Sequence, residues 1–107
     1  MDEYAHLVYK VTKNFPKEEI FGITSQFRRA TLSIVLNYVE GLARQSTKSN
    51  LSFLDISYGS FKESKYLLYF CFSEGYINKK DYENALKLCE EVGAMLWSTI
   101  QLLRKTV

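Results

Sequence analysis

The chain has 107 residues, of which 47% are hydrophobic and 24% charged, with a formal net charge of +2. This length suits a single domain, residues 1–107, built around one core, and the composition excludes a disordered chain. The longest apolar run, residues 66–72, is too short to span a bilayer. Since Met1 is followed by two acidic residues and not by a signal peptide, we expect a cytoplasmic protein with no membrane partner.

Residues 2–14 predict a short amphipathic first helix, because their apolar residues recur at helical spacing. The residue before Pro16 is driven out of the helical region, so the helix should end there. Residues 16–19 have the chemistry of a new first helical turn, with proline followed by carboxylates.

Residues 22–44 predict the second helix, which carries a polar stripe between two apolar flanks. The stripe consists of Gln26, Arg29, Ser33, Asn37, Glu40 and Arg44. One flank consists of Ile23, Phe27, Ala30, Ile34, Tyr38 and Gly41, and the other of Leu32, Leu36, Val39 and Ala43. A helix with two apolar flanks should be covered on one side by its own bundle and on the other by something else.

A third helix should follow the polar turn after Arg44, capped by Ser46 or Thr47 and closed by Gly75 in a left-handed conformation. It carries a ridge of small residues, Ser57, Ser60 and Ser64, which lets another helix come close.

The fourth helix should begin after Asn78, with Leu88, Met95 and Leu102 broadening its core stripe. Cys71 and Cys89 make no metal spacing, and we expect both to be reduced and structural. Four helices joined by short loops predict an all-α, antiparallel up-down-up-down bundle.

Many spaced residues between about residues 9 and 105 also resemble one bacterial family. They are the FPKEE run at 15–19, Gly22 to Gln26, Arg28-Arg29-Ala30, Ser33-Ile34, Asn37, Glu40-Gly41, Arg44, Ser46-Thr47-Lys48, Phe53-Leu54, Gly59-Ser60, Glu63 and Gly75-Tyr76-Ile77. The family is that of the small four helix bundle proteins, also called intervening-sequence proteins because genes for some members lie inside insertions in 23S ribosomal RNA genes.

The resemblance implies a left-handed bundle that assembles into a ring of five. It extends to the accessory protein of diversity-generating retroelements, which implies RNA, DNA and a reverse transcriptase as partners for a basic surface. In such a ring, the charge of +2 per chain becomes +10 in total. This chain departs from the family in a first helix one or two turns shorter, and in bulkier residues at positions 35–41.

Two interpretations of the polar stripe stand side by side. In the first, which we favour, Gln26, Asn37 and Glu40 form a hydrogen-bonded network with Arg29 and serines such as Ser60. In the second, Arg29 and Arg44 contact phosphates. The carboxylate of Glu40, which lies on the same stripe, argues against this interpretation, because a surface that binds phosphates should exclude carboxylates. The nucleic-acid candidates are Arg28, Arg29, Arg44 and Lys48.

Arg28 lies off the stripe on a helical wheel. It is either a solvated charge or part of a basic surface, and should not join the same contact as Arg29. The candidates for a subunit interface are Leu36, Val39, Tyr66, Tyr69 and Phe70.

The chain offers no set of residues for catalysis around its single histidine, His6, and no pattern for a metal, a cofactor or a small-molecule substrate. The leading hypothesis is a non-catalytic homo-oligomeric scaffold that presents a basic surface to RNA, DNA or a nucleic-acid enzyme. The alternative is a purely structural or protein-interaction module without nucleic-acid binding.

Overall fold

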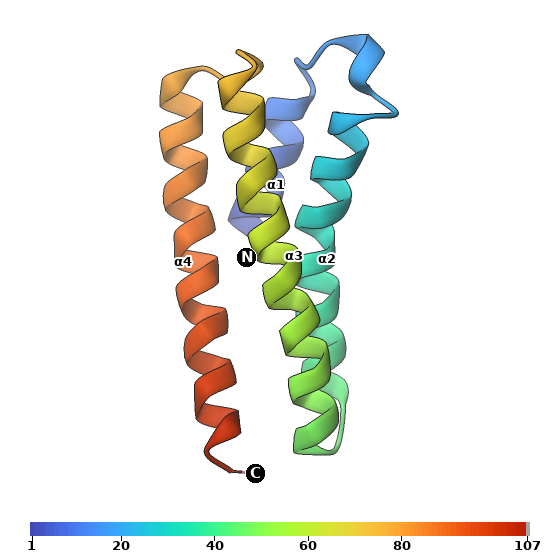
Figure 1. Cartoon of the computed structure of the whole chain (residues 1–107), viewed down its shortest axis with the longest axis vertical. Coiled ribbons are helices and arrows are strands. Elements are labelled where there is room, and N and C mark those ends of the chain that lie inside the picture. The colour runs from blue at the N-terminus through green and yellow to red at the C-terminus, as the bar shows by residue number, and fades with distance from the viewer. Residues whose placement is uncertain (107) are drawn as a thin grey trace.

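A computed structural model describes residues 1–106, which form an antiparallel all-α four-helix bundle (Figure 1). The elements are α1 (Asp2–Thr12), a 3-10 turn η1 (Lys17–Glu19), α2 (Ile23–Ala43), α3 (Thr47–Ser73) and α4 (Lys79–Arg104). The helices run alternately up and down, with α1 behind α3 in the view of Figure 1. The predicted fold class is confirmed. No helix of these described residues is long and apolar enough to cross a membrane.

Local signals set the helix ends where the sequence predicted them. The Ser46 side chain accepts a hydrogen bond from the amide of Ser49 at 3.1 Å, and Asn78 accepts one from the amide of Asp81 at 2.8 Å. Each cap satisfies an amide that the first turn leaves without a partner. Gly75 has a φ of +80° and allows the sharp exit from α3. The segment after Pro16 forms the short helical turn η1, separate from α2, which agrees with the first helical turn predicted at residues 16–19.

The ridge of small residues brings α3 close to α2, as predicted. Ser57 and Ser64 are fully buried. The Ser57 hydroxyl donates to the carbonyl oxygen of Ile34 at 2.7 Å, and Ser64 Oγ lies 2.8 Å from Thr31 Oγ1 and 2.7 Å from the Tyr4 hydroxyl. Buried hydroxyls that are all paired avoid the cost of desolvation without a partner.

The short α1 leaves the lower half of the bundle with three helices (Figure 1). Met1 lies beside Met95, about two-thirds of the way along α4. Along the stripe predicted to broaden the core of α4, Leu88 is half-buried, Met95 is 38% exposed and Leu102 is 62% exposed. The prediction that Met95 and Leu102 are core residues is therefore wrong, because α1 begins only at the height of Met95 and leaves the rest of this face of α4 uncovered.

Candidate interaction surface

The polar stripe of α2 lies along its seam with α3, where its middle part forms hydrogen bonds. Ser33 Oγ lies 2.8 Å from Ser60 Oγ, and the Asn37 amide donates to both the hydroxyl and the carbonyl oxygen of Ser33 at 2.9 Å. These three residues form the part of the expected network that the structure brings together. They join α2 to α3 and leave little of their polar capacity for a ligand.

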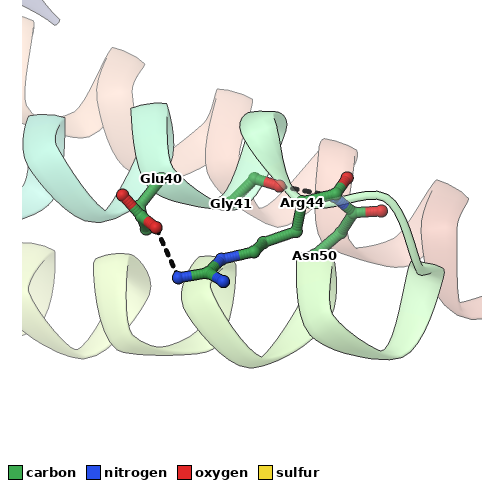
Figure 2. Close-up of polar contacts among 4 residues, drawn as sticks. All are labelled: Glu40, Gly41, Arg44 and Asn50. Atoms are coloured by element: carbon green, nitrogen blue, oxygen red, sulfur yellow. Dashed lines mark hydrogen bonds and ion pairs between the residues drawn. The ribbon is translucent and has the colours of Figure 1, made fainter.

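The lower end of the stripe closes the turn between α2 and α3 (Figure 2). Arg44 forms an ion pair with Glu40 one turn earlier, and its guanidinium lies 4.6 Å from the centre of the Phe53 ring. The Asn50 amide donates to the carbonyl oxygens of Gly41 and Arg44, the second at 2.8 Å. Asn50 thereby satisfies carbonyls that the end of α2 leaves without intrahelical partners. Arg44 is thus occupied by neighbours in its own chain.

The upper end of the stripe is not part of the network. Gln26 and Arg29 are both exposed, and within residues 1–106 neither side chain has a hydrogen bond or an ion pair. The expected network among Gln26, Glu40 and Arg29 is therefore not formed within one chain. Arg29 is left with its full charge in solvent.

Arg28 is half-buried and holds α1 against α2. Its Nε donates to Thr12 Oγ1 at 2.7 Å, its Nη2 donates to the carbonyl oxygen of Tyr9 at 3.4 Å, and its guanidinium stacks 4.6 Å from the centre of the Tyr9 ring. A cation at the C-terminal end of a helix is favourable because the last carbonyls there lack donors. Arg28 is therefore neither of the alternatives that the sequence left open. It is a structural contact between helices.

Arg28 and Arg29 nevertheless border the same shallow groove, of about 560 Å³, which contradicts the expectation that they lie apart. The groove runs over the exposed flank of α2, and Ser25 and Leu32 lie between the two arginines. No acidic residue lines it. Its full lining is Tyr9, Ile20, Phe21, Thr24, Ser25, Arg28, Arg29, Leu32, Ser33, Leu36 and Asn37.

The apolar side chains around this groove are unusually exposed. Phe21, in the segment before α2, is 95% exposed, and Leu36 is 64% exposed. Leu32 and Val39 on the same flank are also exposed. The sequence predicted an uncovered flank here but missed Phe21, whose only signal was a large apolar residue between a turn and Gly22.

A second exposed surface lies on α3. Tyr66 has its ring centre 6.3 Å from that of Tyr69 and 6.4 Å from that of Phe70, and all three are exposed. The five interface candidates thus divide between two helices, with Leu36 and Val39 on α2 and the aromatic cluster on α3.

The four nucleic-acid candidates do not form one patch. Arg28 and Arg44 are held by their own chain, whereas Lys48 is exposed and, within the described residues, has no ion pair. Lys48 lies in the first turn of α3, and Arg29 lies near the height of Ser64, 16 residues further along that helix. At 1.5 Å per residue, this separates the two free cations by about 24 Å.

Both cysteines are buried and free, as predicted. Burial in the core raises the pKa of Cys71 to about 12 and raises that of Cys89 as well. Since the thiolate is the reactive form, these thiols are poor nucleophiles at neutral pH. Within residues 1–106, no group of three or more His, Cys, Asp or Glu side chains is arranged to hold a metal ion.

Two comparisons with known proteins agree with this architecture. A sequence model of the 23S rRNA-intervening sequence protein family matches residues 1–98. A crystal structure of a protein with unknown function from the S23 ribosomal protein family of Bacteroides thetaiotaomicron VPI-5482 superimposes with a TM-score of 0.84, at 25% identity over 92% of each chain. No curated protein matches the chain. Neither matching description names a catalytic activity.

Proposed function

Because this chain belongs to the 23S rRNA-intervening sequence protein family, we propose that it is a non-catalytic module that self-associates into a ring of five copies. The exposed apolar flank of α2, with Phe21 at its upper end, is the observation that supports this most. Contiguous apolar surface of this kind on a small domain marks a protein–protein contact. A chain of 107 residues has too small an interior to hide it.

The energetics favour a contact that uses both exposed surfaces. Fully burying a Val, Leu or Phe side chain contributes about 1.5–3 kcal/mol, whereas association costs about 4–15 kcal/mol in lost translational and rotational freedom. The flank of α2 alone therefore supports only a weak contact. Adding the aromatic cluster of α3 raises the gain further into the range of that cost.

Two different surfaces on one chain favour a head-to-tail arrangement over a symmetric dimer. A contact between unlike surfaces repeats from copy to copy, and it closes into a ring when the rotation between neighbours allows. Five copies is the number that the family resemblance implies.

Light scattering or sedimentation of the purified chain tests the proposal. We expect a mass close to five times 12.5 kDa. Leu36→Glu should lower that mass, because it places a carboxylate in the contact. Gln45→Glu, at an exposed position after the end of α2, introduces the same charge and should leave the mass unchanged. A mass of one chain at every concentration would contradict the proposal.

A second candidate function is contact with nucleic acid through Lys48, which is exposed, lies outside the apolar flank of α2 and has no ion pair within residues 1–106. In a ring of five, Lys48 would be displayed five times, and a charge of +2 per chain would add up to a usable field. A reverse transcriptase as partner stays a prediction of the resemblance.

Binding of structured RNA at increasing salt concentration tests this second candidate. Affinity should fall steeply with salt, because each phosphate contact releases counterions. Lys48→Gln should lower the slope by about 1 per binding copy, and Lys10→Gln on α1 serves as the control. An absence of binding at low salt would leave a protein-interaction module without a nucleic-acid role.

A further inference from the structure

Two exposed faces of the chain are matched in height, chemistry and charge. The first, the α2 face, is defined by Phe21, Arg29, Leu32, Leu36 and Val39. The second, the α3 face, is defined by Ile56, Gly59, Glu63, Tyr66 and Phe70, which recur every three or four residues and share one side of α3. We propose that the α2 face of one copy docks on the α3 face of a second copy in the same orientation. The proposal rests on the self-association proposed above.

Hydrogen bonds between α2 and α3 give the relative heights of these residues along the bundle. Thr31 lies level with Ser64, Ser33 with Ser60, and Ile34 with Ser57. In a ring whose axis runs along the bundle, every copy has the same height, so only residues at equal height can meet. The α2 of one copy then runs antiparallel to the α3 of the next, as neighbouring helices do within the chain.

This register brings opposite charges together. Arg29 lies level with about residues 64 to 66 of α3, within one turn of Glu63. Both side chains are exposed, and neither has an ion pair within residues 1–106. No acidic residue lines the groove beside Arg29. If the α2 face met the α2 face of a copy in the same orientation instead, Arg29 would approach a second Arg29, and like charges would oppose the contact.

The register also matches large residues with open space. Gly59 lies level with the interval between Leu32 and Leu36. It is exposed in the interior of α3, and no heavy atom lies within 4 Å of the position of a Cβ. Glycine is unfavourable there relative to alanine, and packing within the chain gives no reason for it. A gap at Gly59 would admit the exposed leucines of the α2 face of a neighbouring copy.

Apolar residues complete the match above and below. Phe70 lies within about one turn of the height of Phe21, and Ile56 lies level with the interval between Leu36 and Val39. From top to bottom, the contact therefore sets aromatic against aromatic, Arg29 near Glu63, the leucines against the gap at Gly59, and aliphatic against aliphatic.

Charge reversal tests the pairing. Arg29→Glu and Glu63→Arg should each weaken association at least about tenfold, because each creates a like-charge contact. The double variant should assemble as the wild type does. An equimolar mixture of the two single variants should associate more strongly than either variant alone, because a contact between unlike variants pairs opposite charges. A ring of five cannot alternate the two variants all the way round, so the mixture should assemble less well than the double variant. Lys10→Glu, on the exposed side of α1, makes the same charge change as Arg29→Glu and should have no effect.

Gly59→Leu tests the gap. The variant should stay folded, since the space beside Gly59 is open, and a helical circular dichroism spectrum with an unchanged melting temperature of the dissociated chain checks this. Its assembly should be lost. If the wild type assembles and Gly59→Leu and both charge reversals assemble equally well, this pairing of faces is wrong while self-association stands. A monomeric wild type would overturn both proposals.

Discussion

Gly93 of α4 lies against the ring of Phe61 on α3, and replacing it by alanine tests how closely these helices are packed. A Cβ at this position would lie 2.2 Å from Phe61 Cζ, and 2.6 and 2.7 Å from the two Cε atoms. Ordinary contacts of a Cβ begin at 3.4 Å. Phe61 is itself buried and borders an open groove of about 400 Å³ beside Gly93. Its ring must therefore be pushed towards this groove, or α3 and α4 must separate by roughly 1 Å.

The expected cost follows from two opposing effects. Overpacking a core by one methyl group costs about 1–3 kcal/mol and sometimes more, while alanine is about 1 kcal/mol more favourable than glycine in a helix. Because a contact of 2.2 Å is well below the 3.0 Å under which real Cβ contacts are essentially never found, we expect the high end of the packing cost. The net loss in free energy of unfolding should be about 2 kcal/mol, or roughly 10 °C in melting temperature.

Urea denaturation followed by circular dichroism at one low chain concentration measures this loss, since association would otherwise add to the apparent stability. Gly59→Ala is the matched control, because it adds the same methyl group to a helix interior with nothing within 4 Å. It should stabilise the chain by up to about 1 kcal/mol. Phe61→Leu should recover part of the loss in the Gly93→Ala background. If Gly93→Ala were as stable as Gly59→Ala, the close packing of α3 on α4 would be refuted.

Three further predictions concern buried polar groups. Ser64→Ala leaves the buried Tyr4 hydroxyl without its partner at 2.7 Å and should cost about 1–3 kcal/mol, measured by urea denaturation, whereas a cost near zero would show that the hydroxyl finds another partner. Thr24 Oγ1 is buried with no hydrogen bond, so Thr24→Val should leave stability unchanged or raise it, and a clear loss in melting temperature would contradict this. Burial raises the pKa of Cys71 from 9.0 to about 12. Between these values the unfolded chain loses the thiol proton and the folded chain keeps it, so the free energy of unfolding is unaffected by this group below pH 9 and falls as the pH rises towards 12. Cys71→Ala should therefore show a smaller fall in melting temperature over this range than the wild type, and equal falls would contradict the assignment.

Much of the fold was predictable because its signals are local. The caps at Ser46 and Asn78 and the turn at Gly75 each depend on a few neighbouring residues. The spacing of apolar residues along α2 likewise predicted which flank would be buried and which exposed, because a helix repeats its faces regularly. The ridge of serines on α3 predicted a close approach for the same reason.

The candidate surface was predictable only in part. The sequence indicated that Leu36, Val39 and the aromatic cluster of α3 would be exposed, but not that Phe21 would extend the same face. It placed Arg28 on the surface, whereas the guanidinium reaches Tyr9 and Thr12 on a different helix. A long side chain can select its partner among all the groups within its reach, so its environment depends on which helix happens to lie beside it.

By itself, then, the sequence determined four helices, their ends and the side that each turns to the core, because hydrogen bonding in a helix and its periodicity involve only residues a few positions apart. The tertiary structure decided how far the core extends. Leu102 has the spacing of a core residue and is exposed because α1 begins only at the height of Met95 and does not cover the lower part of the bundle. The tertiary structure also decided that Arg29 and Glu63 come to nearly the same height on neighbouring helices. Both outcomes depend on the lengths and the register of packed helices, which no local stretch of the chain encodes.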